Sequence, residues 1–377
     1  MAELTPRAIV VVLDGCGAGA APDAAEFGDT GGPSTLLHVW RHVGGFSAPN
    51  LARTGYLAAA GIGQAPGARY GRLQELSQGK DSVTGHWEMM GAVTEQPFPT
   101  YPGGFPIPLI KRFESEIGTQ TLGNRAASGT QIIAELGPFH QEVGFPIVYT
   151  SADSVFQIAA HEETVPIETL YEWCLVARGL LVEPDNVQRV IARPFLGNPG
   201  AYVRTERRKD FPLSPPPNLV DTIGNVEGIG VVPELFAGRG FVPRPRSQSN
   251  PEHALALGKA LETDARFVFA NFEDFDMKYG HRNDPDGFAR CLEEFDGILA
   301  DLIGRMRDAD LLILTADHGN DPTDASSDHS REYVPVALVG AGVDPAPIGD
   351  VVGFTAVGAT VAEHLGVEWP MGRSLLG

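Results

Sequence analysis

Three apolar runs in this chain are each followed at once by aspartate and histidine residues, and this pattern restricts the possible folds most strongly. The runs cover residues 8–13, 266–272 and 310–315, and their length and composition predict buried strands. In an open α/β sheet, ligands bind beyond the carboxyl ends of the strands. Three segments far apart in the sequence can therefore converge on one site.

The polar residues after these runs include a complete set of metal-ligand types. Three aspartates and three histidines suit two divalent ions held by mixed oxygen and nitrogen ligands, and they are Asp14, Asp276, His281, Asp317, His318 and His329. An aspartate or histidine after a strand is, by itself, an ordinary turn or cap residue. Three blocks that together complete a two-metal set favour a dinuclear site over three unrelated turns.

A fourth block, residues 79–91, supplies a candidate nucleophile. It reads Gly-Lys-Asp-Ser-Val-Thr-Gly-His-Trp-Glu-Met-Met-Gly and contains two hydroxyls, Ser82 and Thr84. A hydroxyl is a weak nucleophile until a base or a metal activates it. Serine and threonine are also favoured at helix N-caps, and a cap residue can serve as a nucleophile as well. Both hydroxyls therefore remain candidates.

Four long motifs follow one another along the chain. They cover Leu13–Asp29, Lys80–Glu88, Tyr149–Glu163, and the pair Asp274–Arg282 and Asp317–Pro335. In content and order they resemble the motifs of the phosphopentomutases, a family of the alkaline phosphatase superfamily. The resemblance extends from residue 9 to about residue 340.

The resemblance and the pattern of elements imply the same α/β fold. We expect an alkaline phosphatase-like core with a mostly parallel sheet flanked by helices, plus an inserted α/β cap domain. Segments rich in proline at 97–106 and 212–217 break the pattern. We therefore expect the core at 1–97 and 216–377 and the cap at 98–215. Expected helices are 50–60, 107–118, 128–136 and 166–178, and expected cap strands are 146–150 and 187–193.

The resemblance also assigns roles at the site. It implies one ion, usually manganese, held by Asp14, Asp317 and His318, and a second held by Asp276, His281 and His329. The nucleophile position falls on Ser82, where phosphopentomutases usually carry threonine. Serine fills this role in alkaline phosphatases, so the chemistry is retained, and Thr84 is the alternative nucleophile.

Substrate contacts are implied in the expected cap, where basic residues are concentrated in an otherwise acidic chain. Arginine recognises phosphate with two parallel hydrogen bonds, although a solvated basic face is an alternative explanation. By resemblance, Arg189 and Arg204 would hold the distal phosphate of a sugar phosphate. Ser151 and Asp153 would contact the sugar.

One position departs from the family pattern in a way that concerns the substrate. Phosphopentomutases carry Ile-Gly-Lys where this chain has Ile229-Gly230-Val231, and that lysine helps bind the substrate phosphate. Another basic residue, Arg239, Arg244 or Arg246, could replace the contact. Alternatively, the preferred substrate has changed.

The expected activity is that of a phosphopentomutase, which interconverts the 1-phosphate and 5-phosphate of ribose or deoxyribose. By resemblance, the cofactors would be two divalent ions, Mn²⁺, with a sugar bisphosphate that primes Ser82. The alternative is a phosphomutase or phosphatase for another small phosphorylated sugar or cyclitol. A metal-binding relative without catalytic activity is a third interpretation, which the intact ligand set disfavours.

Composition limits the partners and the compartment. A net charge of −20 argues against nucleic acid and anionic membranes as partners. Three widely spaced cysteines, Cys16, Cys174 and Cys291, suggest no disulfide framework and fit a reducing compartment. The apolar run before Asp14 is too short for the core of a signal peptide. We therefore expect a cytoplasmic enzyme, and the sequence does not indicate its oligomeric state.

Overall fold

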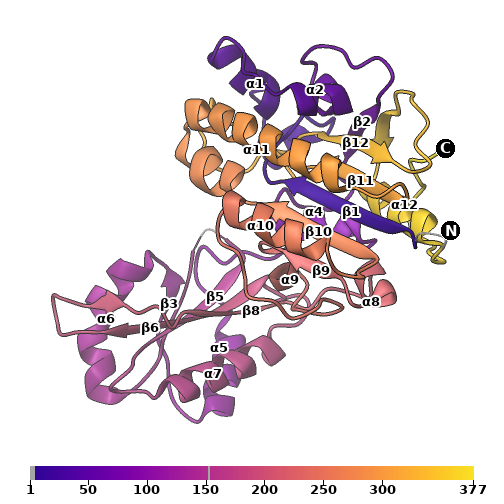
Figure 1. Ribbon diagram of the computed structural model, residues 1–377. Coiled ribbons are helices and arrows are strands. Elements are labelled where there is room, and N and C mark those ends of the chain that lie inside the picture. Colours follow the sequence, from indigo (N-terminus) through magenta and orange to yellow (C-terminus); the bar gives the residue numbers. More distant parts are fainter. Residues whose placement is uncertain (1–4, 152) are drawn as a thin grey trace. The chain divides into compact units, whose positions relative to one another are not determined.

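The computed structural model describes residues 5–151 and 153–377, and the chain divides into two compact units. Unit 1 comprises Met1–Pro97 and Pro215–Gly377, and unit 2 comprises Phe98–Ser214. Each unit has its own β-sheet with packed helices (Figure 1). Unit 2 is one continuous segment of the chain, whereas unit 1 is formed from the segments on either side of it.

Unit 1 contains a mixed sheet in which most neighbouring strands are parallel. Its order is β13 (Gly349–Val352), β2 (Arg69–Gln74), β12 (Val334–Gly340), β11 (Asp310–Thr315), β1 (Arg7–Leu13), β10 (Phe267–Phe272) and β9 (Glu227–Ile229). Strand β12 runs antiparallel to both of its neighbours, and the other pairs are parallel. The expected α/β class with a mostly parallel sheet is confirmed.

The central strands β11, β1 and β10 are aligned so that their carboxyl ends share one edge. Val12 is paired with Asn271 on one side and with Thr315 on the other. All three strands are fully buried, as the uninterrupted apolar runs predicted. The segments that follow the strands therefore begin next to one another.

Helices lie on both faces of this sheet. Helices α10 (Asn250–Ala260) and α11 (Pro285–Arg305) cover the face that is in front in Figure 1, and α11 also contacts α1 (Thr35–His42) and α2 (Pro49–Thr54). Helix α12 (Thr355–Leu365) packs against β1 and α4 (Ser82–Met89), and α4 contacts α9 (Val232–Leu235). The remaining short helices of unit 1 are η1 (Ala24–Phe27), α3 (Tyr56–Ala59), α8 (Leu219–Ile223), η2 (Phe275–Tyr279) and η3 (Gly280–Arg282).

The helix expected at 50–60 is instead two helices, α2 and α3, which meet at Gly55. This residue has a φ of 89°, in the left-handed region that favours glycine. A Cβ atom at Gly55 would lie 2.4 Å from the ring of Tyr70. The break thus brings the backbone close to β2, a tertiary constraint that the helical sequence pattern did not indicate.

Unit 2 has a sheet with helices on both faces. The strand order is β3 (Leu122–Ala126), β4 (Ile147–Thr150), β5 (Val155–His161), β6 (Arg189–Leu196) and β7 (Val203–Arg204), with β8 (Lys209–Pro212) also paired to β6. Helices α5 (Ile107–Ile117) and α7 (Ile167–Leu180) share one apolar core with the sheet. Helix α6 (Gly129–Val143) contributes Ile132 and Ile133 to a second core.

Helix α6 extends seven residues beyond the end expected at residue 136, although Pro138 lies inside it. Proline normally weakens a helix interior. Here tertiary contacts hold the last turns in place. His140 is fully buried, and its Nε2 accepts a hydrogen bond from the backbone amide of His161 at 2.8 Å. Of the residues described, none belongs to a helix that is both long and apolar enough to cross a membrane.

A buried ion pair anchors the amino ends of the central strands. Arg7 is 1% exposed, and its guanidinium donates two hydrogen bonds to Asp310, at 2.5 and 3.2 Å. A third donation reaches the carbonyl oxygen of Leu261 at 2.6 Å. This pair fixes the start of β1 against β11. Loss of one partner would leave the other charge buried with fewer contacts.

We predict that Arg7→Met lowers the free energy of unfolding by about 3 kcal/mol, because the buried Asp310 carboxylate loses its main partner. Arg307 also contacts Asp310, which keeps the loss at the lower end of the usual range. Arg72→Met is the control, since its pair with Asp350 is solvent-exposed and should contribute less than about 1 kcal/mol. Chemical denaturation would measure both losses, and equal effects would contradict the prediction.

Candidate metal centre

The aspartates and histidines expected to bind metal lie together at the carboxyl edge of β11, β1 and β10. Asp14 directly follows β1, Asp276 lies in η2 just after β10, and Asp317 and His318 follow β11. The Nε2 atom of His318 is 3.4 Å from Asp14 Oδ1 and 3.5 Å from Asp317 Oδ2. These three residues form one compact donor group.

Asp276 is the centre of a second set of contacts. Its Oδ2 is 3.1 Å from His281 Nε2, and its Oδ1 is 3.5 Å from His329 Nε2. The Nε2 atoms of these two histidines are 3.1 Å apart. The ring of His329 stacks on His318 with a centroid distance of 4.0 Å, which joins the two sets.

Two triads in this cluster have ligand atoms within 4.8 Å of one another. One consists of Asp14, Asp317 and His318, and the other of Asp276, His318 and His329. His318 therefore belongs to both triads. His281, which the resemblance assigned to the second ion, lies beside that triad through its contacts with Asp276 and His329.

The donors fit divalent cations. Asp14 Oδ1 and Asp317 Oδ2 are buried and have no hydrogen-bond partner among the described residues. Buried polar atoms are normally paired, because leaving such an atom unpaired costs free energy. Carboxylate oxygens and imidazole nitrogens are suitable ligands for manganese, zinc and similar ions. One such ion, held by the triad of Asp14, Asp317 and His318, would satisfy both orphaned oxygens.

The aspartates strongly influence one another's ionisation in the metal-free protein. Burial, together with repulsion from Asp317 and Asp276, raises the pKa of Asp14 well above its ordinary value. Burial also raises the pKa of Asp317. Burial opposes ionisation of Asp276 too, but hydrogen bonds from His281 and His329 outweigh it and hold its pKa well below the ordinary value.

The histidines differ in their proton affinity. The hydrogen bond to Asp276 raises the pKa of His281 to about 9. Burial lowers the pKa of His318 to about 3, so this imidazole is neutral and ready to act as a ligand. A metal held by His281 would therefore displace a proton from it, whereas one held by His318 would not.

Ser82 is the first residue of α4, and its Oγ lies 3.2 Å from His318 Nε2. Asp81 caps this helix by accepting hydrogen bonds from the backbone amides of Val83 and Thr84. Thr84 is completely buried, and its Oγ1 donates to the carbonyl oxygen of Asp81. Among the described residues, the hydroxyl of Ser82 thus contacts a candidate metal ligand, whereas that of Thr84 is bonded to the backbone of its own helix cap.

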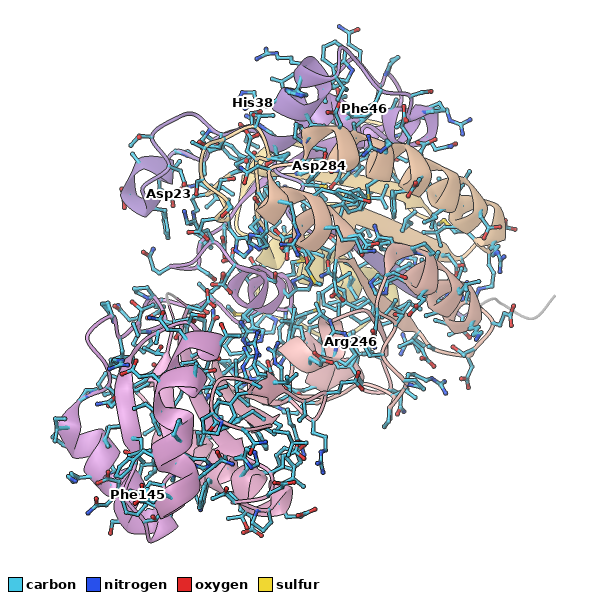
Figure 2. The ribbon with its side chains drawn as sticks, turned by 90° about the vertical axis from the view of Figure 1, so that its left-hand side faces the viewer. Asp23, His38, Phe46, Phe145, Arg246 and Asp284 are labelled. Carbon is cyan, nitrogen blue, oxygen red and sulfur yellow. The ribbon has the colours of Figure 1, made fainter. Side chains whose placement is uncertain are left out.

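Arg331 fixes the loop before Ser82 to the segment that carries His329. Its buried guanidinium donates to Glu75 Oε2 at 2.6 Å and to the carbonyl oxygen of Gly79 at 2.6 Å. It also donates to Asp23 Oδ2 at 2.8 Å, and Asp23 is labelled beside the short helix η1 in Figure 2. One side chain thus links three loops around the site.

Three contacts of the ligands were not anticipated from the sequence. The amide nitrogens of Asn271 and Asn320 donate to Asp14 Oδ2 and Asp276 Oδ1, each at 2.6 Å. His86 is fully buried in α4, with its Nδ1 3.4 Å from Asp317 Oδ2 and 2.8 Å from the carbonyl oxygen of Ser82. These residues lie inside the motifs. However, an asparagine at the end of an apolar strand does not by itself indicate a contact with a metal ligand.

The expected substrate contacts lie in unit 2. Ser151 Oγ donates to Asp153 Oδ2 at 3.2 Å. Arg189 begins β6, whereas Arg204 is paired with Phe195 six residues further along that strand, on the order of 20 Å away at the backbone. The two arginine backbones are therefore well separated, and a joint phosphate contact depends on their long side chains.

A further basic group surrounds the hydroxyl of Tyr149. This hydroxyl is buried without a hydrogen-bond partner among the described residues. Burial raises the pKa of Tyr149, while the positive charges of Arg193, Arg204 and Arg208 oppose that rise. The guanidinium groups of these arginines therefore lie near the phenol, and Arg193 also donates to Gln157 Oε1 at 3.0 Å. Arg193 had not been selected as a site residue.

Of the arginines that could replace the missing lysine, Arg246 shares a carboxylate partner, Glu273, with the backbone of Val231. Arg239 is paired with Asp221 and Arg244 with Glu227. Arg246, labelled in Figure 2, donates at 2.8 Å to both Glu234 and Glu273. The Glu273 carboxylate also accepts a hydrogen bond from the backbone amide of Val231.

Comparisons with known proteins agree on the class of this chain. A model of the Metalloenzyme superfamily matches residues 242–369. The chain is 48% identical to a phosphopentomutase of Dictyoglomus turgidum, covering 96% of this chain and 95% of that protein. It is 50% identical to a phosphopentomutase of an Anaeromyxobacter species, covering 98% of both. The solved structure of the PH0037 protein from Pyrococcus horikoshii has a similar fold, with a TM-score of 0.52 and 16% identity over 98% of this chain and 100% of that one.

We predict that the affinity of the metal-free protein for Mn²⁺ rises with pH until about 9. Below that pH the imidazole of His281 carries a proton that the metal must displace, and above it the proton is already absent. Calorimetric titrations at several pH values, in buffers with different heats of ionisation, would measure affinity and proton release.

The variant His281→Ala should show a weaker pH dependence and release fewer protons. The control His42→Ala removes an exposed histidine on α1 and should behave like the unaltered protein. A pH-independent affinity in the unaltered protein would contradict this prediction.

Proposed function

The chain belongs to the phosphopentomutase family, and from this membership we propose that it interconverts the 1-phosphate and 5-phosphate of ribose or deoxyribose through a phosphoserine at Ser82. The enzyme is a metal-dependent intramolecular phosphotransferase. We further propose that two Mn²⁺ ions are held by Asp14, Asp317 and His318, and by Asp276, His281 and His329, with His318 at their junction.

Ser82 supports this reaction most directly, because its Oγ is 3.2 Å from the histidine common to both triads. Ser82 also begins a helix, where the partial positive charge of the first turn favours a phosphate. Thr84, by contrast, is buried and bonded to the carbonyl oxygen of Asp81. This arrangement favours Ser82 as the nucleophile.

In the proposed cycle, phospho-Ser82 transfers its phosphoryl group to the free hydroxyl of a bound sugar monophosphate. The bond between Ser82 Oγ and phosphorus breaks, a bond from the sugar oxygen to phosphorus forms, and the hydroxyl proton ends on Ser82. The resulting sugar bisphosphate turns around and returns its other phosphoryl group to Ser82. When bound, the two ions supply positive charge that neutralises the transferring group.

The side chains of this chain supply orientation. Asp81 caps α4 and so fixes the backbone that carries Ser82, while Arg331 fixes the preceding loop. In unit 2, we propose that Arg189 and Arg204 hold the distal phosphate and that Ser151 and Asp153 contact the sugar. Exclusion of water is required in any such cycle, because phosphoserine would otherwise be hydrolysed.

Val231 favours a second candidate, in which the preferred substrate is another small phosphorylated sugar or cyclitol. The family lysine that contacts the substrate phosphate is absent here, and Arg246, which shares Glu273 with the backbone of Val231, already contacts two carboxylates. A sugar bisphosphate as primer and a cytoplasmic location remain part of the proposal. The latter is compatible with three free cysteines in the described chain.

The activity is tested by incubating the Mn²⁺-loaded enzyme with ribose 5-phosphate and a catalytic amount of sugar bisphosphate. Formation of ribose 1-phosphate and release of inorganic phosphate are then measured together. Isomerisation well in excess of release supports the mutase. Release in excess, or isomerisation only of a different sugar phosphate, supports the second candidate.

We predict that sugar bisphosphate places one phosphate on Ser82, detectable by mass spectrometry of the peptide Asp81–Trp87. Ser82→Ala should abolish turnover but retain the binding of two Mn²⁺ ions, because the protein ligands remain. Thr84→Val is the matched comparison and should keep the phosphorylation site. A phosphate found on Thr84, or on neither residue, would refute the assignment of the nucleophile.

We predict that Val231→Lys tightens the binding of ribose 5-phosphate by up to about 1.5–3 kcal/mol if this sugar is the natural substrate. The new ammonium would regain a charge-assisted contact that the family has. If the pocket serves another substrate, the lysine brings no gain, because it places a charge where an apolar side chain now packs. Kinetics of both proteins on ribose 5-phosphate distinguish these results. The control is Val232→Lys, which places the same charge at a fully buried neighbouring position and should only impair the enzyme.

A further inference from the structure

Asn271 contacts the metal-ligand carboxylate of Asp14 from the end of β10. Its side chain is completely buried, and its amide nitrogen donates to Asp14 Oδ2 at 2.6 Å. The other oxygen, Oδ1, has no hydrogen-bond partner among the described residues and is 3.4 Å from His318 Nε2. The amide thus occupies one oxygen of Asp14 and leaves the other facing a ligand histidine.

Asn320 makes the equivalent contact with Asp276. Its side chain is also completely buried, and its amide nitrogen donates to Asp276 Oδ1 at 2.6 Å. The other oxygen, Oδ2, is 3.1 Å from His281 Nε2. Although His329 Nε2 also lies 3.5 Å from Oδ1, the amide hydrogen bond is the shorter contact.

The surroundings of Asn320 leave its side chain little freedom. A Cβ atom at Gly280 would lie 2.7 Å from both the Cγ and the Nδ2 of Asn320, and one at Gly15 would lie 3.2 Å from its Cβ. Its backbone amide donates to the carbonyl oxygen of Gly15 at 2.9 Å and to Thr35 Oγ1 at 3.1 Å. The backbone and the close neighbours together direct the amide group at Asp276.

An uncharged donor suits this position. A lysine or arginine at hydrogen-bond distance would neutralise the carboxylate and compete with a cation for it. An amide orients the carboxylate and satisfies one oxygen while leaving the full negative charge. Donors behind metal ligands commonly fix ligand orientation in this way.

We propose that Asn271 and Asn320 are positioning residues that make Asp14 and Asp276 bind their ions through one oxygen each. A carboxylate that cannot turn to offer both oxygens leaves more coordination positions for the oxygens of the transferring phosphoryl group. The inference rests on the two-metal site of the proposed function. It explains how the proposed ions would keep coordination positions open for the substrate.

The test compares Asn271→Leu and Asn320→Leu with Asn218→Leu. Asn218 is also a buried asparagine of unit 1, but its amide donates to the carbonyl oxygen of Pro216 and its oxygen caps α8. Calorimetric titration with Mn²⁺ gives affinity and stoichiometry, and calorimetric melting of the metal-free protein gives stability. The visible absorption of the Co²⁺-loaded protein reports coordination geometry.

We expect each site variant to bind one of the two ions about 10- to 100-fold more weakly, as is usual when a donor behind a metal ligand is lost. The Co²⁺ spectrum should change in both variants, and kcat should fall more than the KM for sugar phosphate rises. Asn218→Leu should lose stability while keeping unaltered affinities and an unaltered spectrum. If either leucine variant fails to fold, Asn271→Ala, Asn320→Ala and Asn218→Ala are compared in the same way.

Wild-type affinity and an unaltered Co²⁺ spectrum in the site variants would overturn the inference. The inference would also be overturned if the Asn218 variants changed Mn²⁺ affinity and the Co²⁺ spectrum as much as the site variants do. Such changes would reflect only the loss of a buried amide. Failure of the unaltered protein to bind two ions would instead refute the two-metal site. The two failures are therefore distinguishable.

Discussion

Mutual repulsion of three buried carboxylates, Asp14, Asp276 and Asp317, is the constraint on which the rest of this structure depends. They lie together because β1, β10 and β11 are adjacent and parallel and end at one edge. Burial and repulsion raise the pKa of Asp14 and of Asp317, whereas hydrogen bonds from His281 and His329 keep Asp276 ionised by lowering its pKa. A fold that gathers carboxylates at one edge must compensate their negative charge. Divalent cations can do this, because carboxylate oxygens and imidazole nitrogens are suitable ligands for them.

The structure around this edge must hold the three carboxylates together against their repulsion and must limit the movement of the loops that carry the candidate ligands. The pair of Arg7 with Asp310 fixes the opposite ends of the central strands. On the ligand side, the buried guanidinium of Arg331 joins the loops of Asp23, Glu75 and Gly79. Rigid placement of this kind is what phosphoryl transfer requires, since positioning and charge neutralisation provide most of the rate enhancement.

The sequence predicted the parts of this molecule that are encoded in continuous patterns. Uninterrupted apolar runs identified β1, β10 and β11, and aspartates and histidines directly after them identified the ligand candidates. The break at Gly55 was missed because it depends on the ring of Tyr70, from another segment. Asn271 and Asn320 were missed for a related reason, since an amide becomes significant only when its neighbour in space is known to be a ligand.

His318 belongs to both triads, so two ions bound there as proposed would be thermodynamically dependent on each other. An ion bound to one triad would engage the shared imidazole and would place its positive charge close to the donors of the other triad. The two binding events would therefore have a coupling free energy, and by linkage each ion would change the affinity of the other by the same factor. Enzyme carrying a single ion is thus a distinct thermodynamic species, whose abundance depends on that coupling as well as on the concentration of free metal.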